Sequence, residues 1–272
     1  MKDLFGNKIL DLDDLEKNAI QLLQDTKPNK CAFSGGKDSI VIKKLCQLAG
    51  IDCVYEYQNT TIDPPELIYY MRKYHKDVKW NNPEKPFFKM LENNIMPSRL
   101  IRWCCDKYKE SKNEIGDKVV IGVRAAESSA RAKRWLPIKL NTKKHITYIC
   151  PILYWSDNDV WDFIKLYELP YCKLYDEGYK RLGCVGCPMD TKRKKQFLKY
   201  PLYEKQWKRA GKIYFDKMKN KYNEKKDESM SKFYKLFDNF EDFWHWYINS
   251  SESVENYLHT NEQCLGLLEM WS

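Results

Sequence analysis

One short segment combines two adjacent glycines with a lysine, an aspartate and two serines. It follows the apolar run Cys31–Phe33 and precedes a helical pattern, and it consists of Ser34, Gly35, Gly36, Lys37, Asp38 and Ser39. Adjacent glycines let backbone N–H groups point to one side, where they and the start of a helix can hold an anion. Lys37 can bring a positive charge to a phosphate, and Asp38 can hold Mg²⁺ or cap the helix. We therefore predict a phosphate-binding loop; the alternative is an ordinary glycine turn before a capped helix.

Four of the ten cysteines occur as two pairs, Cys104–Cys105 and Cys184-x-x-Cys187. Each pair can bring two thiolates to one metal centre. Mononuclear zinc usually takes two spaced pairs, whereas the ligand positions of a [4Fe–4S] cluster lie further apart and suit adjacent cysteines better. We predict that the four cysteines hold a [4Fe–4S] cluster, with zinc or buried thiols as alternatives. Five other cysteines lie in apolar contexts and are expected in the core: Cys31, Cys46, Cys53, Cys150 and Cys172.

A third group of residues follows the predicted strand Lys118–Val123. Arg124 comes directly after this strand, and the carboxyl ends of strands are where open parallel sheets bind ligands. Glu127 and Arg131 follow at helical spacing. Because the planar guanidinium group suits phosphate or sulfate, we predict that these three residues contact the ligand. The alternative is a surface ion pair between Glu127 and Arg131.

The composition indicates a folded protein. Hydrophobic residues make up 43% of the 272 residues and aromatic residues 14%, which argues against intrinsic disorder. The sequence contains no apolar run long enough for a membrane span, and its acidic start lacks the apolar segment of a signal peptide. Ten cysteines without such a signal point to a reducing compartment, so we expect a cytoplasmic protein.

The positive charge is concentrated in one stretch. The formal net charge is +9, and the stretch from Asp190 to Lys226 holds 14 Lys/Arg against 4 Asp/Glu. Aromatic residues are interleaved with these lysines, which could bind a nucleic acid through residues 191–226 by phosphate contacts and base stacking. The equally weighted alternative is a pair of amphipathic helices with aromatic residues inside and lysines outside.

Strand and helix patterns alternate over the first 190 residues. Strands are expected at Cys31–Phe33, Ile51–Tyr57, Lys118–Val123 and Ile146–Cys150. Helices are expected at Asp11–Asp25, Ile40–Leu48, Pro64–His75, after the capping residue Ser156 and at Phe233–Ile248. The alternation predicts an α/β fold with a mostly parallel twisted sheet flanked by helices. We therefore divide the chain into a nucleotide-binding α/β domain at 1–190 and a basic, aromatic, helical region at 191–272.

Five segments between about residues 28 and 190 resemble the phosphoadenosine phosphosulfate (PAPS) reductase family of the PP-loop ATP pyrophosphatases, an adenine nucleotide alpha-hydrolase-like superfamily. The matching segments are Ser34–Ser39, Asn59–Glu66, Gly122–Arg131, Pro151–Trp161 and Leu174–Pro188. The resemblance implies that ATP, adenylyl sulfate (APS) or PAPS binds at the loop. It also implies a [4Fe–4S] cluster, because the two cysteine pairs match those of assimilatory adenylyl sulfate reductases.

Two activities in sulfur metabolism are compatible with this family. An ATP pyrophosphatase would adenylate an acceptor for sulfur transfer, which requires Lys37 and the complete loop to stabilise departing pyrophosphate. A sulfonucleotide reductase would use a cysteine nucleophile and thioredoxin to form sulfite. The family's C-terminal Glu-Cys-Gly-Leu/Ile-His segment is only partly matched around Cys264. We therefore favour ATP-dependent activation of an acceptor, with an unidentified sulfur donor and a nucleic acid as a possible acceptor. A non-catalytic nucleotide and Fe–S sensor is the third hypothesis, and a homo-oligomer is compatible with all three.

Overall fold

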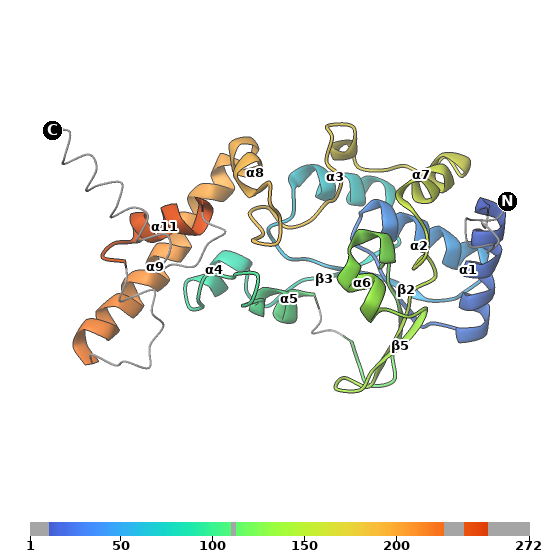
Figure 1. The fold of residues 1–272 in the computed structure, drawn as a ribbon, viewed down its shortest axis with the longest axis horizontal. Helices are drawn as coiled ribbons and strands as arrows, with labels where there is room; N and C mark the ends of the chain where they lie inside the picture. Colours follow the sequence, from blue (N-terminus) through green and yellow to red (C-terminus); the bar gives the residue numbers. More distant parts are fainter. Residues whose placement is uncertain (1–10, 110–112, 226–236, 250–272) are drawn as a thin grey trace. The chain divides into compact units, whose positions relative to one another are not determined.

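The computed structural model describes residues 11–109, 113–225 and 237–249, and these form two compact units (Figure 1). The first unit comprises the described residues of Met1–Pro83 and Cys104–Cys184. The second unit comprises those of Glu84–Trp103 and Val185–Ser272. The predicted division after residue 190 thus lies close to a change of unit, but the segment 84–103 belongs to the second unit.

A six-stranded sheet organises the first unit, in the order β3-β2-β1-β4-β6-β5. The strands are β1 (Lys30–Ala32), β2 (Val54–Gln58), β3 (Lys79–Asn81), β4 (Lys118–Val120), β5 (Ile138–Asn141) and β6 (Ile146–Ile149). All neighbouring strands are parallel except β5, which pairs antiparallel with β6. The predicted α/β class with a mostly parallel sheet is therefore confirmed. Sequence patterns did not reveal β3 and β5, because edge strands of three or four residues carry little periodicity.

One face of the sheet packs against helices α1 (Leu12–Thr26), α2 (Lys37–Leu48) and α7 (Asp157–Leu166). One residue of each of three inner strands, β1, β4 and β6, is fully buried there: Cys31, Val120 and Ile149. Burial in this apolar core explains why the predicted core cysteines pack as hydrophobic residues. Cys31 and Cys46 are buried in this core, and Cys53 packs partly buried against it. Cys150 and Cys172 are also buried, Cys172 in a second cluster.

The remaining helices of the first unit lie next to the carboxyl ends of strands. They are α3 (Pro65–Tyr74), η1 (Ala125–Glu127), α6 (Ser129–Arg134) and η2 (Lys173–Tyr175). Most of helix α5 (Trp103–Tyr108) also belongs to this unit. A second apolar cluster joins α3 to the segment around η2 and contains Phe33, Leu67, Met71, Cys172 and Leu174. This cluster fixes the loops that follow β1 and β2.

The second unit is helical and has an aromatic core. It contains α4 (Phe87–Leu91), α8 (Arg193–Lys199), α9 (Pro201–Lys225) and α11 (Phe240–Asn249). Four aromatic residues of the basic stretch are buried in it: Phe197, Tyr200, Trp207 and Phe215. The amphipathic-helix alternative accounts for these rings, which are therefore not exposed for base stacking. Nucleic-acid binding by residues 191–226 stays a prediction that rests on the lysines.

No helix in the described part of the chain is both long and apolar enough to cross a membrane.

Candidate active site

A cavity of about 390 Å³ lies at the carboxyl ends of β1, β2 and β4. Strand β1 has β2 on one side and β4 on the other, so the strand order reverses at this point. Such a reversal opens a crevice between the loops that leave neighbouring strands, which is where α/β sheets bind ligands. Many of the predicted ligand residues line this cavity: Ser34, Gly36, Asp38, Ser39, Glu127 and Arg131.

The loop between β1 and α2 has the geometry that its two glycines allow. Gly35 has a φ of +72°, in the left-handed region that favours glycine. A Cβ atom at Gly35 would lie 2.7 Å from Leu67 Cδ1 and 2.8 Å from Met71 Sδ, so α3 leaves no space for a side chain. Gly36 has an ordinary φ of −80° and precedes the first residue of α2. The turn therefore directs the start of α2 toward the cavity, as the glycine pattern predicted.

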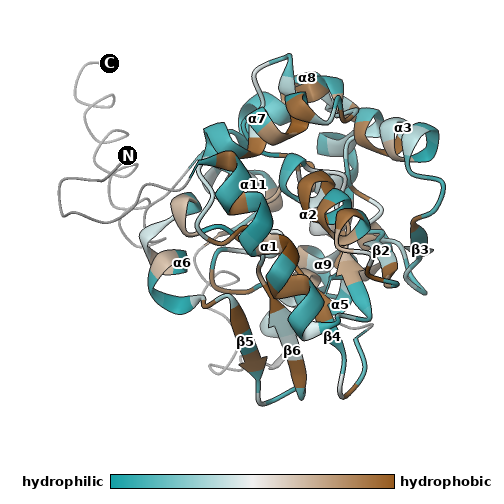
Figure 2. Ribbon diagram, turned by 90° about the vertical axis from the view of Figure 1, so that its right-hand side faces the viewer, coloured by the Kyte–Doolittle hydropathy of each residue, from teal (hydrophilic) through white to brown (hydrophobic). Residues whose placement is uncertain are grey.

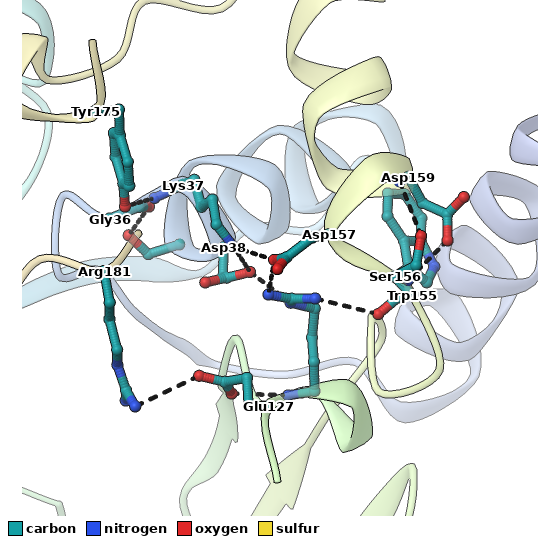
Figure 3. Close-up of polar contacts among 12 residues, drawn as sticks. Gly36, Lys37, Asp38, Glu127, Trp155, Ser156, Asp157, Asp159, Tyr175 and Arg181 are labelled. Atoms are coloured by element: carbon teal, nitrogen blue, oxygen red, sulfur yellow. Dashed lines mark hydrogen bonds and ion pairs between the residues drawn. The ribbon is translucent and has the colours of Figure 1, made fainter. Parts of the chain in front are cut away.

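Tyr175 contacts this helix start, and sequence reasoning did not single it out. The Lys37 backbone N–H donates a hydrogen bond to Tyr175 Oη at 2.8 Å (Figure 3). Burial raises the pKa of the Tyr175 phenol, so the hydroxyl is neutral at physiological pH. The uncharged Tyr175 hydroxyl oxygen thus accepts from one of the backbone N–H groups that were expected to bind an anion. The only sequence signal was that Tyr175 belongs to the family-like segment Leu174–Pro188.

Lys37 and Arg124 do not line the cavity but form a charged cluster with Asp38 and Asp157. Figure 3 shows Lys37, Asp38 and Asp157 of this cluster. Lys37 Nζ lies 2.8 Å from Asp157 Oδ1 and 3.3 Å from Asp38 Oδ1. Arg124 donates from Nε to Asp38 and from Nη2 to Asp157, both at 2.6 Å. The side chains of Lys37 and Arg124 are only 6% and 3% exposed. Both cations therefore position Asp38 rather than point toward the cavity.

Asp157 balances the charge of this cluster. It lies in the first turn of α7, and the hydrogen bond from Lys37 holds the pKa of its carboxyl below the usual range. Asp157 is therefore ionised at neutral pH, so that the cluster contains two cations and two carboxylates. Asp157 directly follows the predicted capping residue Ser156, where an acidic residue is favourable, but sequence analysis did not assign it to the site.

The cations that do line the cavity are Arg131, Arg181 and Lys109. Glu127 pairs with Arg131 and lies 3.6 Å from Arg181 Nη1. The Glu127 carboxylate also accepts the Arg124 backbone N–H at 3.2 Å. The ion pair between Glu127 and Arg131 is thus present, as the alternative interpretation had it, but it lies in the cavity wall. Arg181 lines the cavity although sequence analysis did not name it as a ligand residue.

The first cysteine of the CxxC motif adjoins the same cavity. Cys184 Sγ donates a hydrogen bond to Thr60 Oγ1 at 3.6 Å, and Thr60 in turn donates to Asp63 at 2.7 Å. Tyr57 donates to the same carboxylate oxygen at 2.5 Å. Thr60, Asp63 and Tyr57 all line the cavity. The segment after β2 and the cysteine motif are thereby joined at one wall of the site.

The predicted metal ligands are half-buried, unlike the four core cysteines. They divide between the two units, with Cys104, Cys105 and Cys184 in the first and Cys187 in the second. Among residues 11–109, 113–225 and 237–249, no group of three or more His, Cys, Asp or Glu side chains is arranged to hold a metal ion. Ligation by the four cysteines stays a prediction, and Cys264 lies outside the described residues.

The sequence profile of the phosphoadenosine phosphosulfate reductase domain matches residues 29–190, which span the sheet and every residue lining the cavity. The chain belongs to this PAPS reductase domain family. An uncharacterized Methanocaldococcus jannaschii protein is 32% identical over 76% of this chain and 47% of its own length. The adenosine 5'-phosphosulfate reductase of Staphylococcus haemolyticus is 29% identical over 64% of this chain and 78% of its own length.

This PAPS reductase-family chain spans about half the length, or less, of two relatives from M. jannaschii. Among solved structures, the PAPS reductase of Candida auris in a phosphate complex aligns with a TM-score of 0.49 and 19% identity. That alignment covers 66% of this chain and 98% of the other.

Proposed function

We propose that this family member binds ATP in the cavity and transfers its adenylyl group to an acceptor, as the first step of a sulfur transfer. The observation that carries the proposal is the complete loop Ser34–Ser39 at the reversal of strand order, with four of its residues lining the cavity. The start of α2 offers backbone N–H groups and a partial positive charge to phosphates. Arg131 and Arg181 also line this cavity, and because both pair with Glu127, the three residues together add one net positive charge.

The reaction follows from phosphate chemistry. A nucleophilic atom of the acceptor attacks the α-phosphorus of ATP, and the bond between this phosphorus and the α,β-bridging oxygen breaks. The acceptor's proton is lost to solvent, and pyrophosphate leaves with the bond's electron pair. Negative charge grows on the leaving group, where the arginines and loop amides would stabilise it.

Magnesium would assist by neutralising charge on the phosphates when it is bound. Asp38 fits the role of a magnesium ligand, because it lines the cavity with its side chain 22% exposed and its contacts to Lys37 and Arg124 both use Oδ1. Lys37 acts in this proposal by orienting Asp38, since its ammonium group does not line the cavity.

The iron–sulfur cluster is a further part of the proposal. Its support is the spacing of Cys104, Cys105, Cys184 and Cys187 together with their partial exposure. Metal analysis of anaerobically purified protein should give about four irons per chain for a [4Fe–4S] cluster. One zinc and no iron would contradict the cluster.

The second candidate is sulfonucleotide reduction, favoured by the 29% identity to the S. haemolyticus adenosine 5'-phosphosulfate reductase. Cys264 would attack the sulfate sulfur of APS or PAPS, displacing the nucleotide phosphate and forming an S-sulfocysteine. The two thiols of thioredoxin would then supply the electrons that release sulfite and become a disulfide.

Two parallel assays separate these activities. The protein is incubated with α-³²P-labelled ATP and Mg²⁺, and separately with APS or PAPS and reduced thioredoxin. We expect pyrophosphate and an adenylyl product in the first assay. Sulfite release without ATP cleavage would replace the proposal by reduction, and nucleotide binding without either product would favour a sensor.

A matched arginine pair tests the site itself. Arg131→Gln removes a cation that lines the cavity, whereas Arg134→Gln changes an exposed arginine of the same helix that does not line it. Loss of one charged hydrogen bond, about 1.5–3 kcal/mol, should weaken ATP binding at least about tenfold in the first variant. Calorimetric titration should show the second variant within about twofold of the wild type. Equal affinities of both variants would place the phosphates elsewhere.

Tyr175→Phe is expected to strengthen ATP binding. The variant removes the hydroxyl that accepts the Lys37 backbone N–H, so a phosphate oxygen no longer competes for that donor. Affinity should rise about fivefold, and the ligand-free protein should lose about 1–2 kcal/mol of stability because a donor is left unpaired. Tyr171→Phe is the control, since its exposed hydroxyl bonds Asp176 instead. Weaker ATP binding by the Tyr175 variant would show that the hydroxyl donates to the ligand.

A further inference from the structure

The second face of the sheet carries polar residues along its central row. Strand register places Val54, Lys30, Val119, Tyr148 and Lys139 side by side across β2, β1, β4, β6 and β5. Successive side chains of a strand point to opposite faces, so this row lies on the face opposite the buried core residues. Parallel sheets are normally apolar on both faces. Two lysines and a tyrosine in this row therefore indicate a different role.

A groove of about 610 Å³ lies over this row. Figure 2 shows β4, β6 and β5, which form much of its floor, next to one another. The groove is continuous with the cavity at the phosphate loop, because both are lined by Ala32, Glu56, Gln58, Lys109, Ile121 and Val123. A molecule in the groove would lie directly beside a nucleotide in the cavity.

The groove is positively charged. Four lysines line it: Lys30, Lys109, Lys139 and Lys143. Glu56 is the one carboxylate among its described lining residues, and it is 6% exposed and paired with Lys79 at 3.2 Å. Lys30 is neutralised by Asp117 at 2.7 Å, whereas Lys139 donates to a backbone carbonyl and so keeps its net charge. The groove thus favours an anionic ligand.

Two aromatic rings add a second kind of contact. Trp135 and Tyr148 line the groove with their ring centroids 5.8 Å apart, and both are partly exposed. Lys139 Nζ lies 4.8 Å from the centre of the Trp135 ring, so a cation adjoins this aromatic surface. Cations alternating with accessible rings are how proteins bind single strands, with phosphates on the cations and bases stacked on the rings.

We propose that this groove binds a single-stranded segment of nucleic acid, as the acceptor beside the ATP site. The role as acceptor rests on the proposed function, whereas binding itself does not. Positive charge alone would also suit an acidic polypeptide, but the partly exposed rings of Trp135 and Tyr148 favour bases. The basic stretch 191–226 is the weaker candidate for the specific site, because four of its seven aromatic rings are buried.

Fluorescence anisotropy with a labelled single strand of about 16 nucleotides tests the proposal on the full chain. The groove variant Lys139→Glu/Lys143→Glu is compared with Lys194→Glu/Lys195→Glu, an equal change of charge on exposed lysines of α8. We expect the groove variant to bind at least about tenfold more weakly and to lower the logarithmic salt slope by about 1.4, for two phosphate contacts. The α8 variant should stay within about twofold. Trp135→Ala should weaken binding about fivefold or more through lost stacking.

Three results would overturn the proposal. An equal loss of affinity in the α8 variant would show that binding depends on general positive charge or on the basic stretch 191–226. Unchanged binding in the groove variant would exclude the groove. Competition by polyglutamate as strong as by an unlabelled strand of equal charge would assign the groove to an acidic protein segment. Circular dichroism and urea midpoints check that each variant is folded.

ATP binding is measured separately on the same proteins. A wild type that binds the strand but not ATP would defeat the proposed function and leave the groove standing. If the wild type cleaves ATP but the groove variant binds the nucleic acid as well as the wild type does, the proposed function stands and the groove proposal fails.

Discussion

Gly35→Ala should destabilise the protein by about 2–5 kcal/mol and prevent ATP binding. At a φ of +72°, a residue other than glycine costs roughly 1–2 kcal/mol, and overpacking a filled core adds about 1–3 kcal/mol. The new methyl group would lie 2.7 Å from Leu67 Cδ1 and 2.8 Å from Met71 Sδ, so the loop or α3 must shift. Urea unfolding gives the free energy, and calorimetric titration with ATP gives the loss of binding.

The neighbouring glycine provides a matched control. A Cβ atom at Gly36 would lie 3.4 Å from the Tyr175 hydroxyl oxygen, an ordinary contact at an ordinary φ. Gly36→Ala should therefore change stability by no more than about 1 kcal/mol, the scale of replacing glycine by alanine at a helix cap. Equal destabilisation by the two substitutions would show that the loop does not adopt the described turn.

Arg124→Met should be the second most damaging change, at about 2–3 kcal/mol. Arg124 is 2% exposed and connects Asp38 to Asp157 while donating to the Trp155 carbonyl oxygen at 3.3 Å. Breaking a buried ion pair costs about 3–5 kcal/mol, but water screens the contact to Asp157, whose side chain is 70% exposed. ATP binding should also fall, because Asp38 loses the group that orients it.

The stability difference between wild type and Arg124→Met should depend on pH, and the pKa of Asp157 gives the direction of the change. Lys37 chiefly, and Arg124 in addition, hold the pKa of Asp157 below its usual range. A carboxyl group with a lowered pKa contributes stability above its unfolded pKa of about 3.9 and loses it as pH falls through the folded value. The stability difference between wild type and Arg124→Met should therefore narrow below about pH 4.

Arg134→Met is the control for these measurements, because Arg134 is exposed and its side chain lies outside the cluster. Arg124→Lys should be intermediate, since it keeps the charge but not the two-pronged contact. The free energy of unfolding of wild type and Arg124→Met is compared at pH 3 and pH 7, on either side of the unfolded carboxyl pKa of about 3.9. An equal difference at both pH values would show that Arg124 stabilises the protein only by packing.

The amino-acid sequence by itself determined the parts of the fold that depend on neighbours in the chain. An apolar run, two glycines and a helical pattern predicted the strand, turn and helix around Ser34–Ser39, because each follows from local backbone preference and periodicity. The same reasoning predicted the parallel sheet and the core cysteines. Short edge strands such as β5 escaped it, since four residues show too little alternation.

Only the tertiary structure decided which charged groups face the ligand. Asp157 is 120 residues from Lys37 along the chain, and Tyr175, whose hydroxyl accepts the Lys37 backbone N–H, is 138 residues from it. These partners meet because the sheet order brings the ends of β1 and β4 together with the starts of α2 and α7. Residue types made Lys37 and Arg124 the natural phosphate contacts. The geometry instead pairs both with aspartates. It leaves Arg131 and Arg181, which share the single carboxylate of Glu127, in the cavity wall. Charge pairing depends on distance in space and not on spacing along the chain.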